Sequence, residues 1–123
     1  MVPVSAEEEN RLGIEETKAD VFIHGANAVS LDGEIIIGDY IGNRVVGSSP
    51  GSRMLIFVIG VNKICTDLIK GYKRAKNFAA KVNALRLGLK DSDEISVFWL
   101  VINRKSPLME KGIVVLINEW LGY

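Results

Sequence analysis

The sequence contains one cysteine, Cys65, and one histidine, His24. A single thiol excludes an intrachain disulfide framework, and it cannot supply the several cysteine ligands that an iron–sulfur cluster needs. One histidine also leaves a metal site short of ligands. We therefore expect no metal and no cofactor. We interpret His24 as a structural or pocket-lining residue and Cys65 as a small buried apolar one.

Net charge and long apolar runs are also missing. Fifteen Lys and Arg residues balance fifteen Asp and Glu residues among the 123, so the overall charge does not suggest a nucleic-acid binder. The longest apolar runs, such as 97–102, are too short to span a bilayer, and residues 1–9 lack the basic and apolar regions of a signal peptide. We expect a soluble, cytoplasmic protein that binds neither nucleic acid nor membrane.

Apolar residues are plentiful: they make up 48% of the sequence, enough for the core of one domain. Four compact apolar runs stand at 21–23, 55–59, 97–102 and 113–117. They are nearly continuous rather than alternating, which is typical of strands covered on both faces. The sequence therefore predicts an α/β fold of three layers, with a mainly parallel sheet flanked by helices.

Helix signals lie between these runs. Ser5 with Glu8 forms a potential capping box that opens an acidic helix over 6–17. A longer helix is predicted over 66–87, capped by Thr66, with a basic face that we interpret as solvated. Its predicted apolar stripe consists of Leu68, Tyr72, Ala75, Ala79 and Val82. A short helix should begin at residue 43 or 44. We divide the chain into the acidic helix, 1–18, and an α/β domain, 19–123.

Small and amide-bearing residues follow the first predicted strand. Gly25, Asn27, Asp32 and Gly33 could form a lip that binds phosphate or carboxylate, because glycines allow backbone N–H groups to approach a ligand. The alternative is a strand end followed by an ordinary Asp-Gly turn.

Two further segments carry similar signals. Gly42, Asn43 and Arg44 open the short helix and could bind an anion there, and Asp39 just upstream is a further candidate ligand-binding residue; alternatively, Asn43 caps the helix and Asp39 pairs with Arg44. Asn62 and Lys63 follow a buried strand, where a cationic side chain can meet a carboxylate or phosphate, unless they belong to an ordinary loop. Since each segment flanks the carboxyl end of a strand, we expect all three to converge on one crevice.

The order of these motifs carries a family resemblance. The matching segments are Gly25–Gly33, Gly42–Val45, Gly60–Ile64, Arg74–Ala80, Asn83-Ala84, Arg86-Leu87 and Gly122. Together they resemble the LUD domain of lactate-utilisation proteins. That domain has the fold of ribose-5-phosphate isomerase, glucosamine-6-phosphate deaminase and CoA transferases. The resemblance implies that this chain corresponds to the C-terminal part of the domain, shortened at its N-terminus.

The resemblance also implies a connection with lactate utilisation, where such domains accompany iron–sulfur subunits that oxidise L-lactate. The isomerases of this fold group have a catalytic Asp where this chain has Asn27, and an amide cannot transfer protons as a carboxylate does. We therefore expect an accessory module that binds a small anion without independent catalysis.

Two alternatives stay open. The first is an enzyme with isomerase- or CoA-transferase-like activity on a phosphorylated or acyl substrate, with Asp32, Asp39 and Glu119 as its candidate carboxylates. The second is a structural subunit of a larger complex. A domain that lacks its first portion should expose apolar surface, so we also expect a homo-oligomer or a partner subunit.

Overall fold

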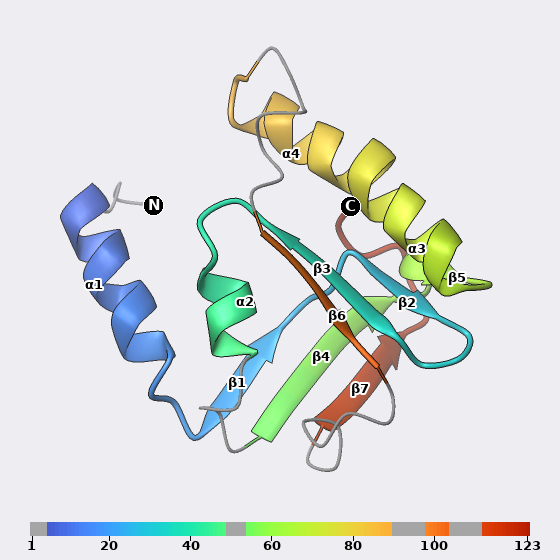
Figure 1. Ribbon diagram of the computed structural model, residues 1–123, viewed down its shortest axis with the longest axis horizontal. Helices are drawn as coiled ribbons and strands as arrows, with labels where there is room; N and C mark the ends of the chain where they lie inside the picture. The colour runs from blue at the N-terminus through green and yellow to red at the C-terminus, as the bar shows by residue number, and fades with distance from the viewer. Residues whose placement is uncertain (1–4, 49–53, 90–97, 104–111) are drawn as a thin grey trace.

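Two β-sheets and a long helix are stacked in the computed structural model, which describes residues 5–48, 54–89, 98–103 and 112–123 (Figure 1). The first sheet is parallel, in the order β1-β4-β7. Its strands are β1 (Val21–His24), β4 (Met54–Gly60) and β7 (Gly112–Ile117).

The second sheet is mixed, in the order β5-β2-β3-β6. Its strands are β5 (Ile64–Cys65), β2 (Ala28–Ser30), β3 (Ile35–Asp39) and β6 (Phe98–Ile102). β3 pairs antiparallel with β2 and with β6, whereas β2 and β5 are parallel. The helical segments are α1 (Ala6–Glu16), α2 (Asn43–Gly47), a 3₁₀ turn (Val61–Lys63), α3 (Leu68–Arg74), a π-helical turn (Ala75–Ala79) and α4 (Ala80–Arg86).

The predicted α/β class, with a parallel sheet flanked by helices, is confirmed. Three of the four apolar runs form the parallel sheet, but the run at 97–102 contributes β6 to the mixed sheet instead. A continuous apolar run indicates a buried strand without specifying its neighbour, so the sequence did not predict the second sheet. Residue 97 and the predicted loop at 90–94 lie outside the described residues, as does most of the loop predicted at 103–112.

β3 is the centre of the core. Ile35 and Ile37 pack towards the parallel sheet, while Ile36 packs on the other side with Ala28 and Ala75. All three isoleucines are fully buried. Because successive side chains of a strand point to opposite faces, β3 joins two hydrophobic clusters into one core.

The N-terminal helix forms as predicted, with its last helical residue at Glu16. The Ser5 hydroxyl accepts a hydrogen bond from the Glu8 amide at 3.2 Å, which satisfies one of the free N–H groups of the first turn. α1 contacts α2 on the side of the molecule away from α3 and α4 (Figure 1).

The long helix differs from its prediction in three ways. Leu68 and Tyr72, which were predicted in the apolar stripe, are exposed. The helix is capped by Asp67 rather than Thr66: the Asp67 carboxylate accepts a hydrogen bond from the Lys70 amide at 2.8 Å, and the Thr66 hydroxyl donates to that carboxylate. Its apolar stripe also changes register, because a π-helical turn inserts an extra residue between α3 and α4. The buried residue after Ala79 is therefore Ala84, five positions on, and not Val82.

One face of the parallel sheet is exposed. Val21 and Ile23 of β1, Met54 of β4, and Ile113 and Val115 of β7 share that face in the strand register and are all exposed; we call these five residues the open face. Ile23 is 61% exposed. The expectation that strands of this sheet are covered on both faces is therefore wrong here. Among the helices of the described residues, none is long and apolar enough to cross a membrane.

Candidate functional site

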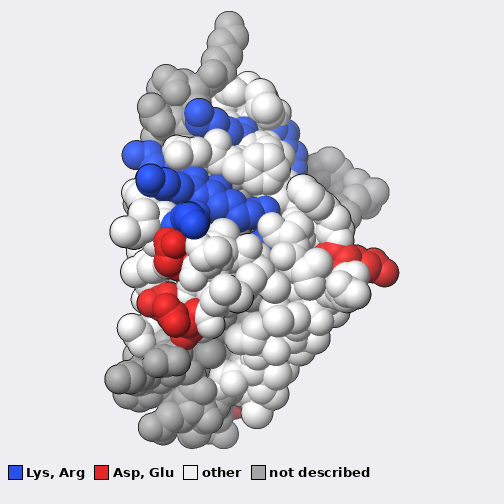
Figure 2. All heavy atoms as spheres, turned by 90° about the vertical axis from the view of Figure 1, so that its right-hand side faces the viewer, with Lys and Arg blue, Asp and Glu red and all other residues white. Residues whose placement is uncertain are grey.

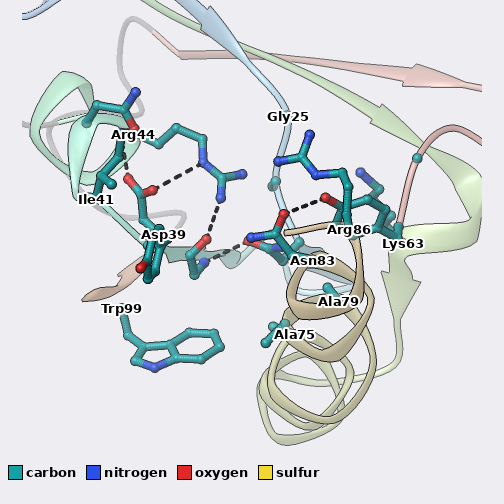
Figure 3. Close-up of a pocket in the computed structure, with 18 of the residues that line it drawn as sticks. Gly25, Asp39, Ile41, Arg44, Lys63, Ala75, Ala79, Asn83, Arg86 and Trp99 are labelled. Atoms are coloured by element: carbon teal, nitrogen blue, oxygen red, sulfur yellow. Dashed lines mark hydrogen bonds and ion pairs between the residues drawn. The ribbon is translucent and has the colours of Figure 1, made fainter. Parts of the chain in front are cut away.

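A cavity of about 580 Å³ opens between the mixed sheet, α2 and α4 (Figure 3). Asp39, Ile41 and Arg44 lie on one side of it, and Lys63, Asn83 and Arg86 lie on the other. Six of the predicted site residues line this cavity: Gly25, Asn27, Asp39, Asn43, Arg44 and Lys63. The four others, Asp32, Gly33, Gly42 and Asn62, do not.

Asn27 is held between strands and is almost completely buried. Its side-chain oxygen accepts a hydrogen bond from the Gly38 backbone amide at 2.7 Å, and the Asn27 backbone N–H donates to the Ile36 carbonyl at 2.9 Å. The Asn27 carbonyl accepts from Nη1 of Arg74 at 2.5 Å. Much of the hydrogen-bonding capacity of Asn27 therefore fixes the cavity wall.

Asp32 and Gly33 lie in the turn between β2 and β3. The Gly33 amide donates to the Ser30 carbonyl at 3.0 Å, and its φ of 87° lies in the left-handed region that favours glycine. For these two residues the structure agrees with the alternative of an ordinary Asp-Gly turn.

Asp39 occupies the anion position that was predicted at the start of α2. Its Oδ2 accepts hydrogen bonds from the amides of Arg44 at 2.7 Å and Val45 at 3.2 Å. Its Oδ1 lies 3.8 Å from Nε of Arg44, and Nη2 of Arg44 donates to the Gly38 carbonyl at 2.6 Å. The expected ligand site at this helix end is therefore already filled by the chain's own carboxylate, as in the alternative of Asp39 pairing with Arg44. The other part of that alternative is wrong, because the cap residue is Gly42 and Asn43 is the first residue of α2.

Gly42 and Asn62 have structural roles. Gly42 precedes α2 with a φ of 90°, next to the ring of Phe98. The Asn62 side chain fastens the C-terminal segment: its Nδ2 donates to the Gly122 carbonyl, and its Oδ1 accepts from the Leu121 amide, both at 3.1 Å.

Lys63 reaches the cavity from the 3₁₀ turn that follows β4, and only 8% of it is exposed. In the part of the chain that the structure describes, its ammonium group has no hydrogen bond or ion pair. Burial lowers the pKa of Lys63 below its usual value, and the positive charges of Arg74 and Arg44 lower this pKa further. Lys63 is thus a largely buried residue whose positive charge is not paired with a side-chain carboxylate among the described residues.

Arg74 supplies a second unbalanced cation behind the cavity wall. Its guanidinium donates to two backbone carbonyls, those of Asn27 and Asn62, and lies over the ring of Phe78 at 5.3 Å from the ring centre. These partners fix the guanidinium without neutralising it.

Several cavity residues were not predicted as site residues. Asn83 and Arg86 come from α4, Trp99 from β6, and Tyr123 from the C-terminal segment. The Tyr123 hydroxyl donates to the Asn83 side-chain oxygen at 2.7 Å. The one available signal was the family resemblance, which included Asn83 and Arg86 as motif positions without assigning them a role.

His24 and Cys65 lie outside the cavity lining. His24 Nδ1 donates to the Gly25 carbonyl and its Nε2 accepts from the Ser48 hydroxyl, each at 2.8 Å. Burial lowers the pKa of His24 from 6.5 to about 4, so the ring is neutral at neutral pH.

Cys65 is half-buried against the cluster of Ala28 and Ile36, and burial raises the pKa of its thiol. Among the described residues, no group of three or more His, Cys, Asp or Glu side chains could hold a metal ion.

The outer surface near the cavity is basic. Figure 2 shows Lys and Arg side chains gathered in a band over α3 and α4, with much of the surface below it uncharged. Exposed basic residues on these two helices are Lys70, Lys73, Lys81 and Arg86. This band places several positive charges on the outer surface of the two helices, with acidic side chains directly below part of it.

Comparison with known proteins identifies the family. The chain is similar to a DUF162 family protein from Deinococcus radiodurans of known crystal structure, with a TM-score of 0.50 and 16% identity. The similarity covers 93% of this chain and 59% of that one, so this chain spans less than two thirds of its neighbour; at this identity the likeness shows the fold. No curated protein matches the chain. The model of the LUD domain matches residues 3–93, well over half of the sequence, and the protein therefore belongs to the LUD domain family.

Proposed function

We propose that this domain binds a small carboxylate or phosphate in the cavity, as an accessory module without independent catalysis. The observation that carries the proposal is Lys63: the residue is only 8% exposed and lines the cavity, and its ammonium group has no partner among the described residues. A buried charge is costly unless an opposite charge accompanies it, so a bound anion would stabilise this arrangement.

The charges around the cavity support an anion over a cation. Lys63, Arg44 and Arg86 contribute three positively charged side chains to the described lining, and Asp39 contributes one negatively charged side chain. Asp39 is already engaged by Arg44 and by two backbone amides. A ligand therefore meets an excess of positive charge, with Lys63 and Arg86 as its principal partners.

Family membership extends the proposal to a physiological setting. LUD domains are connected with lactate utilisation, and we place this domain there, in the cytoplasm, beside subunits that oxidise L-lactate. The likeness in fold supports this setting only at the level of the family.

Proton-transfer catalysis has less support. An isomerase-like mechanism needs a carboxylate free to accept a proton from the substrate. Asp39 is occupied as described, Asp32 lies in the β2–β3 turn outside the cavity lining, and Glu119 is exposed and also outside it. These positions favour binding over an enzyme of that type.

A structural role finds support in the open face. Five exposed apolar side chains on one side of the parallel sheet form the kind of surface that another protein chain covers. We propose that a second copy or a partner subunit covers this face, in addition to the anion site. The two roles are compatible because the cavity lies on the other side of the parallel sheet, between α2 and α4.

Titration with inorganic phosphate and with lactate, followed by amide chemical shifts, tests the anion site. We expect saturable shifts at Gly25, Asn83 and Gly122. Lys63→Gln should weaken binding roughly tenfold or more, since it removes a charge-assisted hydrogen bond. Lys81→Gln, which removes an exposed charge from α4, should leave the affinity nearly unchanged. If both variants weakened anion binding equally, long-range attraction by any positive charge would explain the result, and the proposed contact with Lys63 would be contradicted.

A further inference from the structure

We propose that Lys63 forms a reversible imine with a carbonyl compound that carries an anionic group, of which a 2-oxo carboxylate is the simplest example. This inference rests on the proposed function, because the anionic group is what brings the compound into the cavity. It assigns to Lys63 a covalent role that anion binding alone does not require.

The first support is the access to the amine. Lys63 is 8% exposed, lines the cavity and has no hydrogen-bond partner among the described side chains and backbone groups. A Cβ atom built at Gly122 would lie 3.4 Å from Nζ of Lys63, and the φ of Gly122, 63°, favours glycine there. The absence of a side chain at this position leaves space beside the amine for a reacting carbon atom.

The second support is the electrostatic setting. An imine forms only from the neutral amine, and lysines become nucleophilic near neutral pH when they are desolvated or placed beside other cations. Lys63 meets both conditions, since it is largely desolvated and the positive charges of Arg74 and Arg44 act on its amine. Arg74 is held in place by the carbonyls of Asn27 and Asn62, so its charge is a fixed part of the site.

The third support is the position of the anion-binding groups. Arg86 and Asn83 lie beside Lys63 on the same side of the cavity (Figure 3). Tyr123 donates its hydroxyl proton to the Asn83 oxygen, which leaves the Asn83 NH₂ group available as a donor. A carboxylate held by Arg86 or Asn83 would place an adjacent carbonyl carbon towards the Lys63 amine.

The chemical step balances without an oxidant or a reductant. The nitrogen lone pair of the neutral amine attacks the carbonyl carbon, the C=O π electrons move to oxygen, and one N–H proton passes to that oxygen to give a carbinolamine. The second N–H proton passes to the hydroxyl group, the C–O bond breaks, and water leaves as the nitrogen lone pair forms the C=N bond; hydrolysis reverses the sequence. Neither electrons nor atoms other than those of one water molecule leave the system.

Trapping with cyanoborohydride tests the proposal on the full chain. The protein is incubated separately with pyruvate, with dihydroxyacetone phosphate and with acetone, then reduced, and its mass is measured before and after proteolysis. We expect one adduct at Lys63 with at least one of the two anionic carbonyl compounds, at severalfold higher yield than with acetone. The two anionic arms distinguish a carboxylate from a phosphate as the recognised group. Equal labelling by acetone, or labelling spread over exposed lysines, would overturn the proposal.

Lys63→Arg separates this proposal from the one it rests on. Arginine keeps the positive charge and cannot form an imine, so we expect phosphate or lactate binding to persist while the adduct disappears. Lys81→Arg, on exposed α4, should leave both unchanged. If the wild-type protein binds the anions and yields no adduct, the imine is refuted and the anion site stands; if it neither binds nor reacts, both proposals fail.

Discussion

Acid should destabilise this protein through His24 before its carboxylates are protonated. The ring contacts Phe22 and Phe57, with ring centres 4.9 and 4.8 Å apart, and its two nitrogens bond to the Gly25 carbonyl and the Ser48 hydroxyl. Protonation would turn Nε2 into a donor, so the Ser48 hydroxyl would have to rotate from donor to acceptor, while the positive charge would sit in a largely apolar setting. Burial is the main reason that the pKa falls from 6.5 to about 4.

The sign follows from proton uptake. Between pH 6.5 and about pH 4 the unfolded chain binds a proton at His24 and the folded chain does not. The contribution of the neutral ring to the free energy of unfolding is therefore fully present above pH 6.5 and declines as the pH falls through this window. The difference in the pKa of His24 between the unfolded and the folded chain corresponds to roughly 3 kcal/mol of unfolding free energy, of which about 2 kcal/mol is lost by about pH 5. Since the ring is only partly buried, solvent screening reduces the expected loss at that pH to roughly 1–2 kcal/mol.

Urea unfolding curves at about pH 7 and about pH 5 measure this loss. The matched variant is His24→Gln, which keeps a polar side chain of similar length and does not titrate. It should be less stable than the wild type at neutral pH and show a smaller decline towards acid. An equal decline in both proteins would assign the acid sensitivity to other groups and refute the role of His24.

The other predictions concern packing, capping and association. A side chain at Gly47 would overlap the buried ring of Phe22, so Gly47→Ala should lower the free energy of unfolding by about 1–3 kcal/mol, whereas Gly13→Ala in α1 meets no close neighbour and should raise it by roughly 0.5–1 kcal/mol. Thermal melts of the two variants give opposite shifts if the packing is as described. Asp39→Asn should cost about 1–3 kcal/mol in urea unfolding, because an amide is a weaker acceptor for the first turn of α2; an unchanged midpoint would contradict the capping. Ile23→Lys should convert an oligomer into a monomer in light scattering, and a wild-type protein that is already a folded monomer would refute cover on the open face.

The strands were predictable because burial demands continuous apolar runs, and these runs are the most local signal in the chain. Their pairing was not, since the partner of β6 is β3, more than fifty residues earlier. The long helix shows the same limit at a smaller scale. Its start and its end near Gly88 follow from local capping chemistry, but the π-helical turn, which moves the buried position to Ala84, has no sequence signature of its own.

The cavity divides in a similar way. Asn27 and Lys63 were predictable site residues because both follow the carboxyl end of a strand in the parallel sheet, and the structure places both around one cavity. Asp39 was predicted as a ligand contact, with pairing to Arg44 as the alternative. The two roles need the same residue at the same position, so only the three-dimensional contacts of Asp39 distinguish them. Asn83 and Tyr123 belong to segments forty residues apart, joined by a hydrogen bond that no local pattern encodes.

The double burial of β3 has a consequence for how the protein opens. Removing the α3–α4 layer exposes Ile36, and removing the parallel sheet exposes Ile35 and Ile37, so neither layer can detach without uncovering the middle strand. Local fluctuations should therefore spare this strand, and its amide hydrogens should exchange with solvent only when the whole domain unfolds. Asp39, at the end of the same strand, accepts a hydrogen bond from the first turn of α2. This part of the cavity wall should therefore open only together with β3. Hydrogen exchange should consequently show one slow unit that links the core to the cavity, with α1 as a separate, faster one.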